Sequence, residues 1–253
     1  TRNWDMDLYT YPLLCAGTLV KRYQRFLADI ELETGELITA HCPNTGPMTG
    51  VCQLGAPVQV SYHDNPKRKL AYTWEMIQVD GVWVGINTVL PNRIVKLALQ
   101  QHLFPELGPY QTIRSEVAYG RNQGSRVDFL LTSGERSIYV EVKNTTWSID
   151  DLAVFPDTVT TRGQKHLQEL TDLLPDTRAV MLYFINRGDK TKFAPGDSTD
   201  PIYGKLLRAG IDKGLEVFPC RFEVTPQGVE YLGTAALILP DLCSANQTSE
   251  VWD

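Results

Sequence analysis

The sequence lacks several features that would assign it quickly to a class. No run of apolar residues is long enough to cross a bilayer, which predicts a protein without a membrane partner. Its five cysteines are an odd number and no two are separated by two residues, which argues against a zinc knuckle and a disulfide framework. Reduced thiols, together with no signal-peptide pattern, predict a cytoplasmic protein.

An excess of positive charge is also missing. The chain has 24 Lys and Arg against 30 Asp and Glu, a formal net charge of −6. This balance excludes nucleic-acid binding by bulk charge, so any such binding must use local basic patches. A glycine loop of the GxxxxGK type is absent too, which leaves little support for a sugar- or nucleotide-binding regulator.

The chain does have enough apolar sequence for two small domains, with 253 residues of which 43% are hydrophobic. Its character changes near Pro91. Before that residue, short β-like runs alternate with turns, which predicts a small OB-like β-barrel at residues 9–90. The expected strand runs are Gly17–Glu33, Glu36–Cys42, Pro57–His63, Ala71–Val79 and Val82–Leu90.

After Pro91 the rhythm of helices and strands predicts a mixed α/β (α+β) domain at residues 91–235, followed by a polar tail at 236–253. The amphipathic period predicts helices, and the short apolar runs predict strands. The helices are expected at Asn92–His102, Thr160–Leu174 and Pro201–Lys213. The strands are expected at Ile113–Tyr119, Ala179–Ile185 and Leu215–Val224, beside a hairpin at 125–143.

This hairpin is the most informative segment of the chain. Gly134 and Glu135 fit a two-residue loop, and side-chain alternation then sorts both strands into two faces. The apolar face would pair Leu131 with Ile138, Phe129 with Val140 and Val127 with Val142. The polar face would place Asp128 opposite Glu141 and Arg126 opposite Lys143.

Two facing carboxylates with a lysine beside them indicate metal-dependent cleavage of a phosphodiester. Asp128 and Glu141 would bind Mg²⁺ or Mn²⁺, since hard cations take oxygen ligands and leave positions for water and phosphate. Lys143 would position water or stabilise charge on the phosphate, with support from Arg126 and from Glu116 as a third carboxylate. The alternative is a solvated strand face with an ion pair, because D…ExK spacing often arises by chance.

Basic segments outside the hairpin are candidate nucleic-acid contacts. One interleaves basic and aromatic residues on an expected strand, one is a basic turn between barrel strands, and one opens a helix, whose N-terminus favours phosphate. The residues are Arg22 and Arg25, then Lys67, Arg68 and Lys69, and then Arg162, Gln164 and Lys165. Ordinary solvated surface is the alternative for each. Phe26 is expected in the core, and His166 alone carries no weight.

Ordered segments from about Leu13 to about Tyr231 resemble the sugar fermentation stimulation protein (SfsA) family. They include KRYQRFLAD at 21–29, HCPNTG at 41–46, DN with KRK at 64–69, SR with DF at 125–129, EVK at 141–143 and RGQKHL at 162–167. The resemblance implies an OB-like first domain and a second domain of the PD-(D/E)xK nuclease fold. It also implies cytoplasmic DNA binding, with Asp128, Glu141 and Lys143 at the motif positions. The helix before the strands departs from many such nucleases, because it carries no acidic residue.

The sequence thus predicts a nucleic-acid-binding protein, with DNA favoured over RNA, that cleaves phosphodiesters with Mg²⁺ or Mn²⁺. A non-catalytic DNA-binding regulator of sugar metabolism, keeping the nuclease fold as a scaffold, is the alternative. The facing acids favour the enzyme, because a scaffold has no physical need for them. Both interpretations are compatible with a homodimer.

Overall fold

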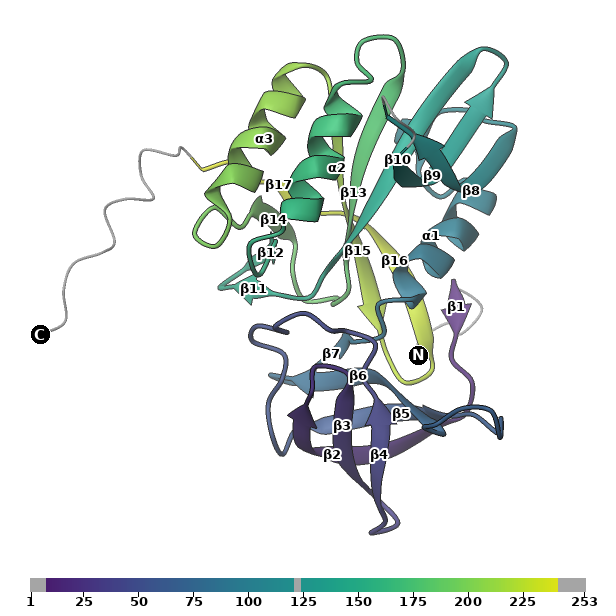
Figure 1. Cartoon of the computed structure of the whole chain (residues 1–253), viewed down its shortest axis with the longest axis vertical. Helices are drawn as coiled ribbons and strands as arrows, with labels where there is room; N and C mark the ends of the chain where they lie inside the picture. Colours follow the sequence, from purple (N-terminus) through teal and green to yellow (C-terminus); the bar gives the residue numbers. More distant parts are fainter. Residues whose placement is uncertain (1–7, 121–123, 241–253) are drawn as a thin grey trace, which may run out of the picture.

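The structure is a computed structural model that describes residues 8–120 and 124–240. Figure 1 shows two domains, a small barrel and a larger sheet covered by helices on its two faces. The part of the chain that the structure describes contains no helix that is both long and apolar enough to cross a membrane.

The first domain is a closed barrel of five strands with a sixth strand attached. Its strands are β2 (Leu14–Tyr23), β3 (Leu27–Leu32), β4 (Leu37–His41), β5 (Pro57–Tyr62), β6 (Tyr72–Val79) and β7 (Val82–Gly85). They lie in the order β4-β3-β2-β5-β6-β7, and parallel pairing of β4 with β6 closes the barrel. Closure leaves few free edges, as expected for an OB-like fold.

One expected barrel strand is in fact a hairpin. The run Gly17–Glu33 divides into β2 and β3, because residues 24–26 form a turn in which Gln24 and Arg25 have φ of 49° and 66°. Short hairpin loops often contain residues in this left-handed backbone region. Phe26, expected in the core, follows directly and is 45% exposed, so that prediction is wrong.

The second domain is built on a seven-stranded mixed sheet in the order β1-β16-β15-β13-β10-β9-β8. Its strands are β1 (Tyr9–Thr10), β8 (Thr112–Tyr119), β9 (Ser125–Ser133), β10 (Arg136–Thr145), β13 (Arg178–Ile185), β15 (Glu216–Val224) and β16 (Gly228–Thr234). A smaller sheet contains β11 (Ser148–Ile149), β12 (Leu152–Phe155), β14 (Lys192–Pro195) and β17 (Ala236–Leu237). The sequence did not indicate these four short strands or β1 and β16.

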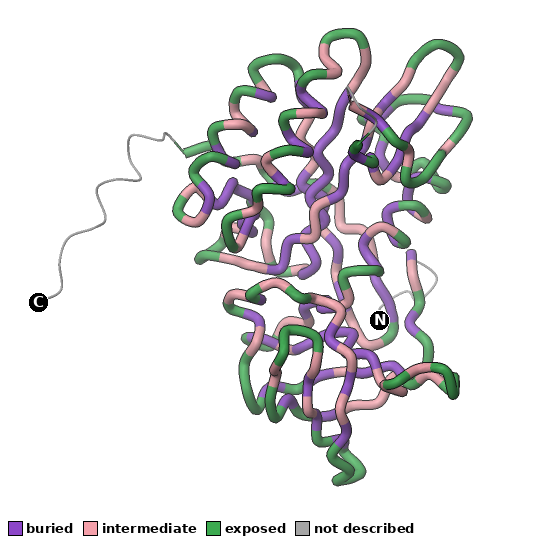
Figure 2. The backbone as a smooth tube through the Cα atoms, viewed as in Figure 1, coloured by how far each residue is buried: buried purple, intermediate pink, exposed green. Residues whose placement is uncertain are grey.

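Helices cover both faces of the large sheet. One face packs against α1 (Leu90–Gln100), and the other against α2 (Thr161–Thr171) and α3 (Pro201–Asp212). A short 3-10 helix, Pro105–Leu107, follows α1. Figure 2 shows the buried backbone concentrated along the central strands, where β13 runs parallel to β10 and β15. A strand covered on both faces needs a continuous apolar sequence, which β13 has.

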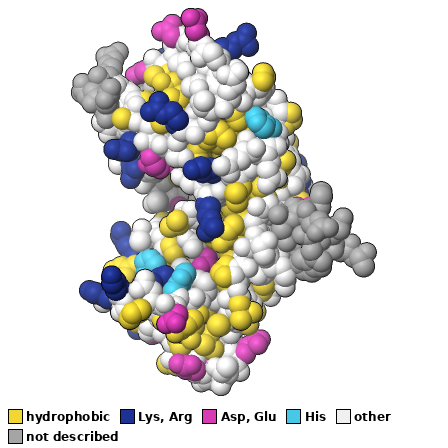
Figure 3. Space-filling view, turned by 90° about the vertical axis from the view of Figure 1, so that its right-hand side faces the viewer, with side chains coloured by type: hydrophobic (Ala, Val, Ile, Leu, Met, Phe, Trp, Pro, Cys, Tyr) yellow, Lys and Arg dark blue, Asp and Glu magenta, His cyan; other side chains and the backbone are white. Residues whose placement is uncertain are grey.

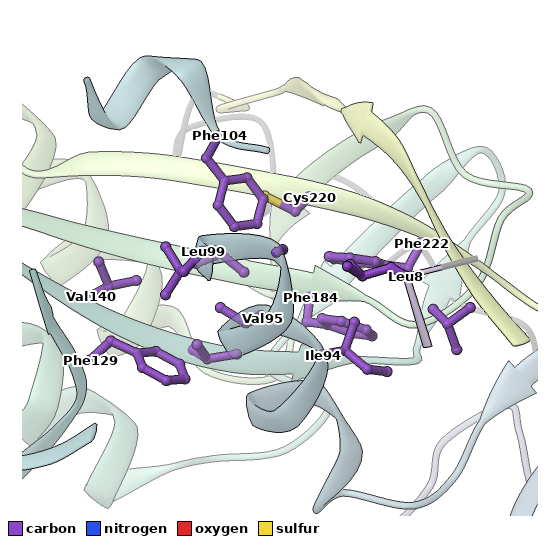
Figure 4. Close-up of a cluster of buried hydrophobic side chains, with 14 of the residues drawn as sticks. Leu8, Ile94, Val95, Leu99, Phe104, Phe129, Val140, Phe184, Cys220 and Phe222 are labelled. Atoms are coloured by element: carbon purple, nitrogen blue, oxygen red, sulfur yellow. The ribbon is translucent and has the colours of Figure 1, made fainter. Parts of the chain in front are cut away.

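The core under α1 illustrates this packing. Figure 4 shows Ile94, Val95 and Leu99 of α1 lying over side chains of the sheet, including Phe184 and Phe222. The rings of these two phenylalanines stack with centroids 3.8 Å apart. The helix thereby packs against the part of the sheet that contains β9 and β10, the strands that carry the expected acids.

The N-terminal segment belongs to the second domain rather than to the barrel. Tyr9 and Thr10 form β1 and pair with β16, while Leu8 and Tyr11 join the core under α1. The expected barrel boundary at residue 9 therefore moves to β2. At the other end, Ala236 pairs with Lys192 in the small sheet, so the expected tail begins later than residue 236, and its last residues, 241–253, lie outside the described ranges.

Candidate metal and phosphate site

The hairpin of β9 and β10 has the expected register near its turn. Ser133 pairs with Arg136, and the ladder continues through Leu131 with Ile138 to Phe129 with Val140. Gly134 lies in the turn with φ of 59°, a conformation that glycine adopts without steric cost. From the turn to the pair Phe129–Val140, the strand pairing is the one that the alternation of apolar and polar residues predicted.

The backbone ladder of the hairpin ends just before the acids. The carboxylate of Asp128 enters the gap, where its Oδ2 accepts a hydrogen bond from the backbone N–H of Val142 at 2.7 Å. Its Oδ1 accepts one from Nδ2 of Asn92, on α1, at 2.7 Å. Asp128 is therefore held by two separate elements, and the expected direct pairing of Val127 with Val142 is replaced by a side-chain contact.

A local rotation of β8 and β9 accompanies this change. Glu116, on β8 beside Asp128, has φ of 53°, which is uncommon for a residue other than glycine and interrupts the regular pleat. Phe129 and Val142 consequently pack under α1, whereas Val127 packs with the core under α2 and α3. The prediction that Val127 shares a buried face with Phe129 is therefore wrong, although both are buried.

Glu141 lies on β10 with only 3% of its surface exposed and is bound through one oxygen. Its Oε1 accepts hydrogen bonds from Nζ of Lys143 at 2.7 Å and from Nδ1–H of His166, on α2, at 2.6 Å. Its Oε2 is buried and has no hydrogen-bond partner among the described residues. A buried carboxylate oxygen without a partner is costly unless a ligand completes it.

The pKa values of the two acids move in opposite directions. Burial, reinforced by the charge of Glu141, raises the pKa of Asp128 to about 6, and the Val142 N–H, Lys143 and Asn92 only partly offset this. Burial also acts to raise the pKa of Glu141, but His166 and Lys143 outweigh it and the net pKa is lowered. The neighbouring acid thus contributes to the raised pKa of Asp128, whereas the contacts with His166 and Lys143 decide the direction for Glu141.

Both acids open into one pocket of about 410 Å³, which we call the acid pocket. It brings together six of the residues expected to form the site. They are Glu116, Arg126, Asp128, Glu141, Arg162 and Lys165. Lys143 does not line the pocket but contacts Glu141, and His166 lines it from α2. Three acids with three cations around one space suit a phosphate accompanied by a divalent cation.

The residues present fit a hard cation with few protein ligands. No group of three or more His, Cys, Asp or Glu within residues 8–120 and 124–240 is arranged to hold a metal ion. Asp128 and Glu141 alone match the one or two carboxylates with which Mg²⁺ is usually held. The partnerless Oε2 of Glu141 supplies the vacant oxygen that such binding needs.

Among the expected nucleic-acid contacts, Gln164 and Arg22 are each held by more than one hydrogen bond within the protein. Gln164 donates its amide to both carboxylate oxygens of Asp200, at 2.9 and 3.0 Å, and so joins α2 to the start of α3. The Arg22 guanidinium donates to the carbonyls of Arg25, Asn44 and Gly46, and so holds the barrel loop at 41–50. These contacts assign both side chains a structural role in the unbound protein.

The other basic residues of the barrel lie apart from the acid pocket. Arg25, Lys67 and Lys69 are exposed, whereas Arg68 donates to the hydroxyl of Thr73 at 2.8 Å. In the space-filling view of Figure 3, Lys and Arg side chains are distributed along both domains without forming one continuous patch. On the face shown, this distribution offers local contacts rather than a continuous track for a phosphate backbone.

His166 is the site residue that sequence reasoning missed. It is buried on α2, and Arg162, one turn earlier, places Nε 3.5 Å from its Nε2. A lone histidine on a helix carries no signal of its own. The four-residue spacing to Arg162 put both on one helix face, and only the fold shows that this face meets Glu141.

Comparisons with known proteins assign both domains. Residues 20–86 match the family model described as the SfsA N-terminal OB domain, and residues 89–228 match the sugar fermentation stimulation protein RE domain. The sugar fermentation stimulation protein homolog of Trichormus variabilis is 67% identical over 237 residues, covering 92% of this chain and 98% of the relative. The homolog of Synechocystis sp. is 65% identical over 234 residues, covering 92% and 99%.

A solved structure shares the fold. The structure of Pyrococcus furiosus SfsA in complex with Ca²⁺ superposes with a TM-score of 0.82, and the match covers 92% of this chain and 99% of that chain. The two sequences are 24% identical, so this likeness concerns the arrangement of barrel and sheet.

Proposed function

Because the chain belongs to the sugar fermentation stimulation protein family, we propose that it is a cytoplasmic DNA-binding protein that cleaves phosphodiesters with Mg²⁺ or Mn²⁺ at the acid pocket. The second domain would supply the chemistry, in the manner of a PD-(D/E)xK nuclease. The barrel would supply part of the contacts that bind the nucleic acid.

The buried Oε2 of Glu141 is the observation that carries the proposal. Lys143 and His166 both bind Oε1, which leaves Oε2 without a hydrogen-bond partner among the described residues. Asp128, in the same pocket, has a pKa raised to about 6 by burial and by Glu141, so it too gains from a cation. A shared divalent cation would relieve both costs.

Each residue around the pocket then has a defined task. Asp128 and Glu141 would hold the ion, which when bound supplies a polarised water and charge neutralisation. Lys143 would orient that water or donate to a phosphate oxygen, and His166 would hold Glu141 in place by its short hydrogen bond. Arg126, Arg162 and Lys165 would contact the phosphates on either side, as charge-assisted donors.

The solved relative from Pyrococcus furiosus supports a cation in this fold. That protein is in complex with Ca²⁺, which also takes oxygen ligands. Ca²⁺, like Mg²⁺, is a hard cation that binds oxygen atoms, so a carboxylate site in this fold is compatible with that complex.

A non-catalytic DNA-binding regulator is the second candidate. Both oxygens of Asp128 already accept protein hydrogen bonds, from Asn92 and from the Val142 N–H. Helix α1, which contributes Asn92, has no acidic residue in its first turn to add a ligand. Because protein hydrogen bonds already occupy both carboxylate oxygens of Asp128, this residue has no need of a metal, which favours a scaffold role for the domain.

One assay separates the two candidates. Labelled single- and double-stranded DNA and RNA are incubated with the protein in Mg²⁺, Mn²⁺ or EDTA. The enzyme predicts metal-dependent cleavage of DNA that Asp128→Asn abolishes, while Asp80→Asn, an exposed aspartate in a barrel turn, cleaves normally. DNA that is bound but never cut under any metal condition would reject the enzyme in favour of the regulator.

A further inference from the structure

A second pocket, with no residue in common with the acid pocket, lies where the two domains meet. It has a volume of about 230 Å³, and we call it the interdomain pocket. The barrel contributes Asn44 and the segment after β7 contributes Thr88, while the second domain contributes the end of β10 with Trp147 and the segment after β12 with Asp157. This volume is below that of drug-sized sites, so it suits one small planar group better than a whole cofactor.

The interdomain pocket contains polar groups without partners. Thr145 is only 1% exposed, and its Oγ1 has no hydrogen-bond partner among the described residues. Asn44 accepts the Gly46 N–H through its Oδ1, so its amide NH₂ remains to donate. Native proteins rarely leave buried hydroxyls unpaired, and such a group indicates a missing water or ligand.

Trp147 provides a flat apolar surface beside these polar groups. Its ring lies close to Gly50, where even a single added carbon would come within 3.8 Å of the indole Cδ1. Trp147 lines the interdomain pocket and is only partly buried. A partly exposed indole next to hydrogen-bonding groups is how single-stranded nucleic-acid sites stack a base.

Asp157 adds an acceptor to the donors. Its Oδ2 receives a long hydrogen bond of 3.4 Å from the Thr49 N–H, and burial raises the pKa of this carboxyl. A carboxyl group accepts well from an exocyclic amino group, as when Asp or Glu reads cytosine. Adenine, cytosine and guanine have such an amino group, and thymine does not.

The position of the interdomain pocket relates it to the proposed cleavage site. Thr145 follows Glu141 by four residues on the same strand β10, which is about 13 Å at the rise of a β-strand. A nucleic acid strand with one phosphate at the acid pocket can therefore extend a neighbouring base along β10 toward Trp147.

We propose that the interdomain pocket receives one unpaired nucleobase with an exocyclic amino group, from the strand whose backbone reaches the acid pocket. Trp147 stacks on the base, and Asp157 accepts a hydrogen bond from its amino group. Thr145 and Asn44 hydrogen-bond to the other polar atoms on the edge of the base. This proposal rests on the proposed function for the identity of the ligand. Enzymes that handle unpaired bases read them by this combination of stacking and edge contacts.

The test uses the full chain in EDTA, so that it does not depend on cleavage. The protein is titrated with dAMP, dCMP, dGMP and dTMP, and separately with deoxyribose 5-phosphate and glucose. The readout is the indole N–H resonance of Trp147, assigned by its loss in Trp147→Phe. The three amino-bearing nucleotides should shift it saturably, and dTMP and the two sugars should bind at least tenfold more weakly.

Two variants sharpen the test. Thr145→Val removes a hydroxyl that has no partner in the unbound protein, so Tm should stay equal or rise, while nucleotide affinity falls by about 3–10-fold. Asp157→Asn should reduce the preference for amino-bearing bases over thymine. The exposed Thr18→Val, on barrel strand β2, serves as the control and should bind like the wild type.

Equal shifts with deoxyribose 5-phosphate, stronger shifts with glucose, or wild-type affinity in Thr145→Val would overturn the proposal. Failure of the proposed function is visible separately. If no DNA is cleaved with any metal but the amino-bearing nucleotides still shift Trp147, the base pocket stands and the nuclease does not. If cleavage occurs without any base-dependent shift, the reverse holds.

Discussion

The two halves of the β9–β10 hairpin differ although they belong to the same strands. In the half next to the turn, residues 129–140, backbone pairs follow in regular register and apolar side chains fill the core under α1. In the other half the ladder ends, and side chains of the helices contact the acids, Asn92 at Asp128 and His166 at Glu141, which Lys143 also contacts. The first half is held by backbone pairing and burial, and the second by polar side-chain contacts.

This difference shows how a rigid sheet can present charged groups. The regular half fixes the position of the strands, so the other half can give up backbone hydrogen bonds without unravelling. The freed N–H of Val142 then binds the carboxylate of Asp128 directly. This difference predicts that substitutions in the half next to the turn lower the free energy of unfolding, and that substitutions in the other half change cleavage and metal binding.

The largest effect is expected from Phe129→Ala in the regular half. Phe129 is 2% exposed, and removing its ring leaves a cavity under α1 that should lower the free energy of unfolding by about 3–5 kcal/mol. Urea unfolding followed by circular dichroism measures this. Ser133→Ala, near the turn, is the control and should change little. A loss below about 1 kcal/mol for Phe129→Ala would contradict a structural role for this half.

Lys143→Ala should have the next largest effect, which is measured on the cleavage of bound DNA. A group that acts on the transition state contributes little to ground-state affinity, so DNA binding should remain nearly unchanged. Cleavage should fall by roughly 10²–10³-fold, the usual effect of losing one charge-stabilising donor. Lys192→Ala, which removes an exposed ion pair with Asp151, should cleave normally. Wild-type cleavage by Lys143→Ala would show that this lysine has no part in the reaction.

The pH dependence of stability should come next. The pKa of Asp128 is raised from an ordinary 3.8 to about 6, first by burial and then by Glu141. A raised pKa means that folding favours the protonated form, so this contribution is complete below pH 3.8 and disappears as pH rises through about 6. Its full size is about 2–3 kcal/mol. Asp128→Asn should remove this fall and be more stable than the wild type at pH 7.

Urea midpoints at several pH values between about 4 and 7.5 measure this effect. Mg²⁺ at pH 7 should stabilise the wild type and leave Asp128→Asn unchanged, because the ion would bind the ionised carboxylates. Calorimetry should detect proton release on Mg²⁺ binding near pH 6. Equal Mg²⁺ binding by both proteins would refute the metal role of Asp128.

The smallest effect is expected outside the hairpin, in the barrel. Replacing Lys67, Arg68 and Lys69 by alanine should weaken DNA binding and flatten its salt dependence without slowing cleavage of bound DNA. Because Arg68 is bonded to Thr73, the two lysines should account for the change, a slope smaller by about 1.4–1.8. Fluorescence anisotropy over a range of salt concentrations measures the slope. An unchanged slope would remove this loop from the DNA-binding surface.

The sequence predicted those parts of the fold that local patterns determine. Alternation of apolar residues fixed the register from Ser133 to Phe129, and the apolar run at Ala179–Ile185 identified the central strand. These patterns work because burial on one face, or on both, constrains every residue of a strand. The barrel and the three helices followed from the same periodicities.

The remaining features depend on contacts between distant segments. Asn92 reaches Asp128 across 36 residues and His166 reaches Glu141 across 25, and no local period encodes either contact. The rotation at Glu116, which sends Val127 to the other core, depends on one unusual φ angle. Arg22 has the composition of a phosphate contact, but the adjacent loop offers it three carbonyls.

The pairing of β1 with β16 has a consequence for how the two domains are joined. Because Tyr9 and Thr10 pair with a strand of the second domain, the chain crosses to the barrel once before β2 and returns once after β7. The barrel is thus an insertion that is connected at both of its ends, unlike domains joined end to end by one linker. These two connections, together with the hydrogen bond from the Gly85 N–H to the carbonyl of Asn186, hold the barrel beside the sheet.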